Sequence, residues 1–511
     1  MKYFSHCIII FLAVLLNACQ KEYDPLPANQ ISISNEQIIL NPNGDAPLTA
    51  SISLTTSEQT KISLRVVGKN GAESDILKDF DDVNTVHSIP VLGLYPDYNN
   101  TVEINFKNAS GIIIGTKTYS VKTAVLPPDI FPAITINTKQ PGIEPGLTLV
   151  SYFGQSLTSS VPQYPFMFDA FGDIRWYFDF RNSAALNNLF YDVGMERLQN
   201  GDLYFGNTNS GTIYEADMQG KIIDTWPLPG YIFHHNVQEK ANGNFLVTVG
   251  KENASTVEDY IVEVDRQSKQ IIRTWDLHQS LQYNRRTLSN DPVDWIHVNA
   301  VIYDASDSSI IISGRVQGLI KLDQNNNVVW IMGCHAGWGV AGNGTDLNQY
   351  LLQPLDKNNQ PITDNSILNG NTNSPDFEWN WYQHAPMLKP DGHIMLFDNG
   401  GDNRNFSGSG QYSRAVEYNI DKNNKTVRQV WEYGKERGAE TYSSIVSDVD
   451  FLNDDNHVIF SSGAVNNTTT YGKVVEVDYT TQAVLFEATI TPPKALYGIT
   501  FHRTERMSLY P

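Results

Sequence analysis

The chain has 511 residues, with 36 Lys and Arg against 56 Asp and Glu, which gives a formal net charge of −20. Charged residues make up only 18% and aromatic residues 11%, a profile that excludes disordered, coiled-coil and collagen-like chains. The acidic balance disfavours a broad nucleic-acid-binding surface, so we expect no nucleic-acid partner. Length and composition favour one large or two ordinary domains, rich in β-structure and with ample core.

Residues 1–19 have the features of a bacterial lipoprotein signal peptide. Lys2 precedes an apolar run, residues 8–16, that is too short to span a bilayer. The sequence Leu16-Asn17-Ala18-Cys19 resembles a lipobox, and cleavage before Cys19 would leave a lipidated N-terminal cysteine. An ordinary signal peptide with an incidental cysteine is the alternative. We therefore expect a lipid-anchored protein in the periplasm or at the cell surface.

Two β-rich regions follow. Residues 20–125 contain short runs that alternate apolar and polar side chains between turn clusters, which predicts a small N-terminal β-sandwich. Residues 126–148 contain Pro127-Pro128 and Pro141-Gly142, and we expect them to form a linker. Cys334 is the one cysteine left after position 19, so the mature chain is expected to hold no internal disulfide.

Residues 149–511 repeat. A strand, an acidic or amide-rich turn and a strand ending in an aromatic residue recur at intervals near 50 residues, with one interval about twice as long. The repeats end at Trp176, Trp226, Trp275, Trp330, Trp431 and Phe486. One hairpin and one aromatic residue per unit are typical of propeller blades, so six units predict a six-bladed β-propeller.

A second repeated element carries histidines. His235, His297 and His384 each lie seven positions before the first residue of a turn. Equivalent positions in different blades form a ring around the propeller axis, so we expect the three side chains to meet at one end of the channel. His234 competes with His235, because neighbouring residues on a strand face opposite ways, and the register favours His235.

Two further polar residues lie close to His297 in sequence. Arg315 lies at a strand end just after the apolar run Ile310-Ile311-Ile312. An arginine at the protein surface would not need such an apolar neighbourhood. Asn299 is two residues from His297 and so shares its face of the strand. We expect Arg315 to line the channel, whereas Asn299 either lines it or satisfies a turn.

Three long motifs at these positions resemble the bacterial arylsulfate sulfotransferase family. They are Asp294-Trp295-Ile296-His297-Val298-Asn299 with Ser313-Gly314-Arg315-Val316-Gln317-Gly318, Gln383-His384-Ala385-Pro386 with Leu396-Phe397-Asp398-Asn399-Gly400, and Ser413-Arg414-Ala415-Val416-Glu417-Tyr418. The resemblance covers roughly residues 150–490. It implies a six-bladed propeller that moves a sulfuryl group from a phenolic sulfate ester to a phenol acceptor, with no nucleotide sulfate donor and no cofactor.

The resemblance also implies roles for individual residues. His384 is the implied nucleophile, sulfated on nitrogen during a ping-pong cycle, with His297, Asn299, Arg315 and one of His234 and His235 around it. Ser447 or Ser444 is a candidate for a hydroxyl residue that lines some family sites, and Cys334 alone cannot make the disulfide of some members. Homodimerisation is possible because some members pair.

The chemistry explains these residue types. A neutral imidazole is a competent nucleophile near pH 7 and is not repelled by a sulfate ester. The Arg315 guanidinium can hold two sulfuryl oxygens and Asn299 can add a neutral donor. His297 or His235 can protonate the departing phenolate, and Trp295 and Tyr382 are candidates to stack on the phenyl rings.

Two other functions stay open at this point. Three histidines in a channel suit a zinc-dependent hydrolase, although Arg315 beside them would repel a divalent cation, so we expect no metal. A propeller at the cell surface can also be a binding module without chemistry. The sequence does not name the natural donor or acceptor, and it does not decide between transfer to phenol and transfer to water.

Overall fold

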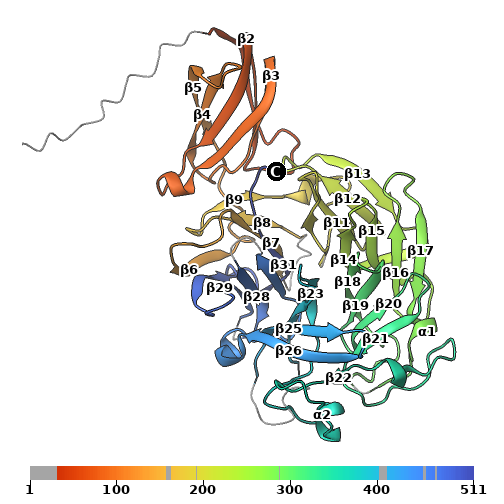
Figure 1. Ribbon diagram of the computed structural model, residues 1–511. Helices are drawn as coiled ribbons and strands as arrows, with labels where there is room; N and C mark the ends of the chain where they lie inside the picture. The colour runs from red at the N-terminus through yellow and green to blue at the C-terminus, as the bar shows by residue number, and fades with distance from the viewer. Residues whose placement is uncertain are drawn as a thin grey trace, which may run out of the picture.

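The computed structural model describes residues 31–156, 163–191, 193–286, 288–401, 411–452, 456–466 and 469–511. It is an all-β structure with an N-terminal domain beside a larger ring of sheets (Figure 1). The predicted signal peptide and Cys19 lie outside the described residues, so lipid anchoring stays a prediction. Within the described residues, no helix is long and apolar enough to cross a membrane.

The N-terminal domain is built on one long strand. Its strands are β1 (Ile33–Leu40), β2 (Ala50–Val66), β3 (Ile76–Val91), β4 (Asn99–Lys107) and β5 (Ile113–Lys122). Because β2 has 17 residues, one half pairs with β1 and β3 and the other with β3 and β4, which joins all five strands into one hydrogen-bonded set. Buried and half-buried residues alternate along both halves of β2, as the apolar-polar pattern predicts.

Six antiparallel sheets follow in the described chain. The first three contain β10 (Glu196–Arg197), β11 (Leu203–Asn207), β12 (Thr212–Ala216) and β13 (Ile222–Pro227); β14 (Tyr231–Glu239), β15 (Phe245–Lys251), β16 (Tyr260–Val264) and β17 (Ile271–Asp276); and β18 (Val298–Asp304), β19 (Ser309–Gly314), β20 (Gly318–Leu322) and β21 (Val328–Met332). The short helix α1 (Leu277–Ser280) follows β17.

The other three sheets take strands from distant parts of the chain. The fourth contains β23 (His384–Leu388), β24 (Ile394–Asp398), β25 (Arg414–Asp421) and β26 (Thr426–Tyr433), and the fifth β27 (Asp448–Leu452), β28 (His457–Val465), β29 (Tyr471–Asp478) and β30 (Val484–Thr491). The long interval between repeats holds α2 (Asn365–Leu368) and β22 (Gln353–Pro354), which lies parallel to the outer strand β26. The stretch expected as a linker contains β6 (Ala133–Lys139), which pairs with β30 at the edge of the fifth sheet.

The sixth sheet closes the ring by joining the two ends of the repeat region. The C-terminal strand β31 (Gly498–Met507) pairs with β7 (Leu147–Gln155), which is followed in the sheet by β8 (Phe166–Phe168) and β9 (Ile174–Tyr177). The first strands of neighbouring sheets contact one another from β14 through β18, β23 and β27 to β31, so they line the centre. The prediction of an all-β chain with propeller architecture is confirmed.

The repeated tryptophans connect neighbouring sheets. The indole N–H of Trp226 donates to the main-chain oxygen of Arg266, and that of Trp275 donates to Asp323, each in the turn of the next sheet. Trp176 and Trp431 make the equivalent bond to Met218 and Tyr479. Four of the six repeated aromatic residues therefore tie one sheet to the next, which explains why these tryptophans recur with the period of the fold.

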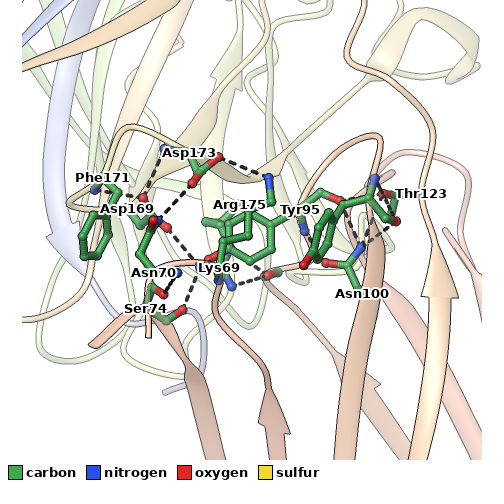
Figure 2. Close-up of polar contacts among 12 residues, drawn as sticks. Lys69, Asn70, Ser74, Tyr95, Asn100, Thr123, Asp169, Phe171, Asp173 and Arg175 are labelled. Atoms are coloured by element: carbon green, nitrogen blue, oxygen red, sulfur yellow. Dashed lines mark hydrogen bonds and ion pairs between the residues drawn. The ribbon is translucent and has the colours of Figure 1, made fainter. Parts of the chain in front are cut away.

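A buried arginine fastens the two domains together (Figure 2). Arg175 of β9 is fully buried and donates to the main-chain oxygens of Gly93 and Ser74 and to the hydroxyl of Tyr95, all in the N-terminal domain. Its guanidinium also pairs with Asp169 at 3.1 Å and lies 3.7 Å from the centre of the Tyr95 ring. Every acceptor around this cation is thus supplied by the fold itself.

Candidate active site

The inner strands bring the predicted histidines together. His235 lies on β14, His297 lies immediately before β18, and His384 is the first residue of β23. The ring centres of His235 and His297 are 5.0 Å apart, and those of His235 and His384 are 6.4 Å apart. The repeated seven-residue offset therefore does place these three side chains at one end of the channel.

The backbone is strained where the histidines enter the centre. His235 has a φ of 57° and His297 a φ of 52°, and the pairing of β14, β18 and β23 with the next strand is interrupted by a bulge at each site. A left-handed conformation costs a non-glycine residue about 1–3 kcal/mol and persists only where the surroundings enforce it. Bulges next to active sites commonly re-aim a side chain in this way.

The bulge also explains why both neighbouring histidines join the cluster. The ring of His234 lies 5.3 Å from that of His297, and its Nε2 is 2.8 Å from a carboxylate oxygen of Glu258. His235 meanwhile contacts His297 through the two Nε2 atoms, which are 3.0 Å apart. The expectation that only one of the pair reaches the centre assumed regular strand alternation, and the positive φ of His235 breaks that alternation.

The tautomer of His384 is set by a neighbouring amide. The Nδ2 of Asn399 donates to the main-chain oxygens of Ser443 and Val446 at 2.8 and 2.9 Å, which fixes its Oδ1 as an acceptor. That Oδ1 lies 2.7 Å from Nδ1 of His384, so Nδ1 carries the proton and Nε2 keeps its lone pair. Burial, together with the charge of Arg315, lowers the pKa of His384 well below its usual range. His384 is therefore a neutral imidazole with an unprotonated Nε2.

His297 has the opposite electrostatic environment. Its Nδ1 lies 2.7 Å from a carboxylate oxygen of Asp294 and 2.7 Å from one of Glu258. Burial by itself would lower the pKa of His297, but the hydrogen bonds to the two carboxylates outweigh burial and raise that pKa to about 9. Despite burial, the hydrogen bonds from His234 and His297 hold the pKa of Glu258 at about 2. Around neutral pH the cluster thus contains one imidazolium ring, His297, and one neutral imidazole with a free Nε2 lone pair, His384.

Arg315 supplies a positive charge to the cluster. Its main-chain N–H donates to the oxygen of His297, which anchors the residue beside the cluster, and its guanidinium lies 5.0 Å from the centre of the Tyr382 ring. Among the described residues, no carboxylate pairs with this guanidinium. A half-buried guanidinium without a counter-ion is suited to an anionic ligand.

The remaining predicted residues lie nearby with other contacts. Asn299 donates from Nδ2 to the main-chain oxygen of Gln383 at 2.7 Å, next to His384. Ser447 accepts from the main-chain N–H of Gly463 at 3.0 Å. Each of these two side chains therefore has a hydrogen-bond partner within the protein itself.

The two predicted aromatic residues differ in their surroundings. Trp295 is buried, and its indole N–H donates to the Asp259 carboxylate at 2.9 Å, so its ring belongs to the core of the third sheet. Tyr382 is half-buried with a φ of 53°, and its ring faces Arg315. Of the two, only Tyr382 therefore lies where it can contact a ligand of Arg315.

Four residues of the cluster were not singled out from the sequence: His502, Glu258, Asp294 and Asn399. His502 on β31 has its ring centre 5.2 Å from that of His235 and 6.2 Å from that of His384. Asp294 and Asn399 lie inside the motifs quoted above, and Phe501-His502 repeats the pair Phe233-His234, which is the signal that could have found it. Glu258 has no such local signal.

The cluster also contains a group that could surround one cation. Ligand atoms of His234, His235, Glu258 and His297 all lie within 4.8 Å of one another, and zinc accepts imidazole and carboxylate ligands. This group differs from the expected three-histidine set, because His384 is absent from it. Glu258 already pairs with two of these histidines, His234 at 2.8 Å and His297 at 2.7 Å.

A cavity of about 480 Å³ adjoins the cluster along the channel. Its lining comes from the inner strands a few residues beyond the histidines and includes Asn236, Ala385, Asp448, Arg503 and Glu505. Residues that directly follow His235, His384 and His502 thus line this space, together with acidic side chains.

Comparisons with known proteins agree with the motifs. The family model described as arylsulfotransferase (ASST) matches residues 133–497, and the one described as the arylsulfotransferase Ig-like domain matches residues 37–124. An arylsulfate sulfotransferase of Escherichia coli O6:H1 is 29% identical, with 92% of this chain and 91% of that protein covered. One of Lelliottia amnigena is 28% identical, with 89% and 90% covered.

Solved structures resemble the chain only distantly. A streptogramin B lyase structure is 10% identical with a TM-score of 0.31, over 70% of this chain and 98% of that one. The fold assignment therefore rests on the strand pairing described above. Because the family model spans well over half of the sequence and its motifs hold the clustered histidines, the chain belongs to the arylsulfotransferase family.

Proposed function

We propose that the histidine cluster moves a sulfuryl group from an aryl sulfate ester to a phenol, with His384 as the nucleophile. The observation that carries this proposal is the arrangement of Asn399, which leaves Nε2 of the neutral His384 ring unprotonated near Arg315, a cation that pairs with no carboxylate in the described part of the chain. A nucleophile next to an uncompensated positive charge suits a substrate that is itself an anion. Family membership favours this enzyme over a binding propeller without chemistry.

In the first half-reaction, Nε2 of His384 attacks sulfur and the bond between sulfur and the phenolic oxygen breaks. Arg315 stabilises the negative charge on the sulfuryl oxygens, which is largest in a loose transition state of this kind. The leaving phenolate takes a proton that originates on His297 and is passed through His235, whose Nε2 is 3.0 Å from Nε2 of His297. The sulfated His384 keeps its Nδ1 proton, and Asn399 Oδ1 accepts the hydrogen bond.

In the second half-reaction the same groups act in reverse. An acceptor phenol gives its proton back to the pair of His235 and His297, its oxygen attacks sulfur, and the bond from sulfur to Nε2 of His384 breaks. One site thus serves both partners in turn, which predicts ping-pong kinetics. A phenol competes with water for the sulfuryl group, so the balance of transfer and hydrolysis depends on how well water is excluded.

The decisive experiment adds the donor without an acceptor. Incubation with 4-nitrophenyl sulfate, acid-free quenching and peptide mass spectrometry should show added sulfuryl mass on the peptide that contains His384, and a later addition of phenol should remove it. The His384→Ala variant should show neither the added mass nor nitrophenol release. A wild-type protein that turns over donor and phenol with no sulfated peptide under trapping conditions would contradict the covalent intermediate.

A metal-dependent hydrolase is the second candidate, and the proximity of His234, His235, Glu258 and His297 is the observation that favours it. Such an enzyme would release nitrophenol from the donor at a rate that added phenol does not change, and chelation would stop it. Transfer to phenol that survives dialysis against a strong chelator, with no metal found by elemental analysis, supports sulfuryl transfer through His384 instead.

A further inference from the structure

The C-terminal strand contributes a fourth histidine ring to the reacting centre. His502 of β31 lies near His235 and His384, with ring centres 5.2 and 6.2 Å away, and its ring centre is 5.1 Å from that of Tyr191. Its side chain is 8% exposed. Because β31 closes the ring of sheets, His502 approaches His384 from the sheet that joins the two ends of the propeller.

The position of His502 is set by the backbone around it. The pairing of β31 with β7 is interrupted between Phe501 and Thr504, and the Ser151 hydroxyl accepts hydrogen bonds from the main-chain N–H groups of His502 and Arg503 at 3.2 and 2.9 Å. The side chain of Arg503 reaches instead to Asp448, 3.3 Å away, at the channel cavity. The bulge thus directs two consecutive side chains to different places, with His502 at the cluster.

The sulfuryl oxygens need more donors than Arg315 can provide. A transferred sulfuryl group exposes three oxygens, and the planar guanidinium can hold two of them. The Asn299 Nδ2, expected to serve as the additional donor, gives one of its two hydrogens to the main-chain oxygen of Gln383 at 2.7 Å. A further N–H donor from another inner strand would complete the set.

We propose that His502 donates an N–H hydrogen bond to a sulfuryl oxygen while the group passes between the aryl sulfate and His384. The inference rests on the proposed sulfuryl transfer and assigns His502 as a residue that touches the transferred group. During the step the bond from sulfur to the phenolic oxygen breaks and the bond from sulfur to Nε2 of His384 forms. His502 keeps its own proton throughout.

The surroundings of His502 favour hydrogen-bond donation over proton exchange. Burial, followed by the charges of Arg503, His234, His297 and Arg315, lowers the pKa of His502 well below its usual range. A ring in this setting resists taking up a proton, so it is a poor base. A neutral imidazole has one N–H in either tautomer and can donate without changing its charge.

The test compares three replacements of His502 in the full chain. His502→Met removes the N–H and keeps much of the volume, whereas His502→Gln and His502→Asn each keep an N–H donor. Rapid-quench measurement of the first nitrophenolate burst from 4-nitrophenyl sulfate reports the transfer to His384. His393→Met is the matched control, because His393 pairs with Glu417 and lies outside the cluster.

We expect His502→Met to slow the burst about 100-fold, as loss of one aimed donor does, while His393→Met stays at the wild-type rate. The faster of the two amide variants should show a burst at least about tenfold faster than that of His502→Met. Its pH profile should match that of the wild type, because His502 exchanges no proton. If His502→Met does not fold, the amide variants decide the question: a burst within about tenfold of wild type in one of them supports the proposal.

Three results would overturn the donor role. They are a folded His502→Met variant within about threefold of the wild-type burst, a loss that neither amide variant recovers, and an amide variant whose pH profile differs from that of the wild type. Failure of the underlying function is distinguishable, because the wild-type protein itself would then show no burst and no sulfuryl mass on the His384 peptide.

Discussion

The domain interface and the histidine cluster each contain an arginine in a largely buried setting, but the two guanidinium groups have different partners. Arg175 at the interface meets two main-chain oxygens, a hydroxyl, a carboxylate and an aromatic ring, all from the protein (Figure 2). Arg315 in the cluster faces the Tyr382 ring, and no carboxylate of the described residues pairs with it. The first cation is compensated within the fold, whereas the second pairs with no carboxylate of the described residues, as its proposed role in binding an anionic substrate requires.

The partners of a buried cation therefore distinguish an arginine that stabilises the fold from one that is available to bind a ligand. A buried cation with all of its donors satisfied contributes to stability, and removing it leaves its partners unpaired. A cation without a counter-ion costs stability in the free protein, and that cost persists where function requires it. Replacing the two arginines should therefore affect different properties of the protein.

The largest expected effect is on stability at the interface. Arg175→Ala leaves the Asp169 carboxylate and the main-chain oxygen of Gly93 buried without their donor, so the free energy of unfolding should fall by about 3–5 kcal/mol. Urea denaturation measures the change, and the rate of transfer by the folded fraction should stay at the wild-type value. Arg181→Ala is the comparison variant, because the Arg181 side chain that pairs with Asp179 is 46% exposed, so its loss should lower the free energy of unfolding by less than Arg175→Ala does.

A wild-type denaturation midpoint in Arg175→Ala would show that the interface does not depend on the compensated cation. A loss of transfer activity in the folded fraction would show that the interface and the cluster are coupled, which the separation of the two sites does not predict.

The second effect is on activity at the cluster. Arg315→Ala removes the uncompensated charge, and turnover of 4-nitrophenyl sulfate should fall about 100-fold, which corresponds to about 3 kcal/mol of transition-state stabilisation. The melting temperature should stay the same or rise, because the variant no longer holds a charge without a partner. Arg315→Lys keeps the charge but loses the planar guanidinium, so its turnover rate should lie between those of the wild type and Arg315→Ala. A folded Arg315→Ala variant with the wild-type rate would remove this residue from the mechanism.

The smallest effect concerns Glu505, a carboxyl group that lines the channel cavity. Burial, together with Asp450 and Glu196, raises the pKa of Glu505 to about 8. Between the ordinary pKa of a glutamate and this value, only the unfolded chain loses its proton, so the free energy of unfolding falls as the pH rises through this window. Glu505→Gln stays neutral at every pH.

We therefore expect the Glu505→Gln variant to melt at the wild-type temperature near pH 4.5 and roughly 1–2 °C above it near pH 8. Differential scanning fluorimetry across this range measures both curves. Parallel curves for the two proteins would show that Glu505 is ionised in the folded state near neutral pH, against the raised pKa.

The repeats were strong enough to predict the architecture. Trp226 and Trp275 recur because the indole N–H of each donates a hydrogen bond to the following sheet. The sequence interval between these aromatic residues therefore equals the interval between sheets. The same regularity placed His235, His297 and His384 at one level of the ring. β6 was missed because it pairs with β30, about 350 residues later, and its own sequence contains no sign of that partner.

The details of the site were harder to predict, for an identifiable reason. The choice between His234 and His235 assumed regular alternation, and a positive φ at His235 brings both rings against His297. His502 lies in β31, which pairs with β7 from the other end of the repeat region, so no hairpin between the two strands marks its register in the sequence. Glu258 precedes β16 in a loop of the second sheet, so nothing local connects it with His297.

The sequence by itself determined the repeating strands, their apolar faces and the level at which the histidines occur, because these depend on periodicity and local chain geometry. Only the tertiary structure decided the protonation of the rings and the donors available to a sulfuryl group. Those properties depend on which carboxylate, amide or guanidinium lies within hydrogen-bonding distance, and these partners come from different sheets. Charge states in a buried site are therefore set by contacts between distant residues.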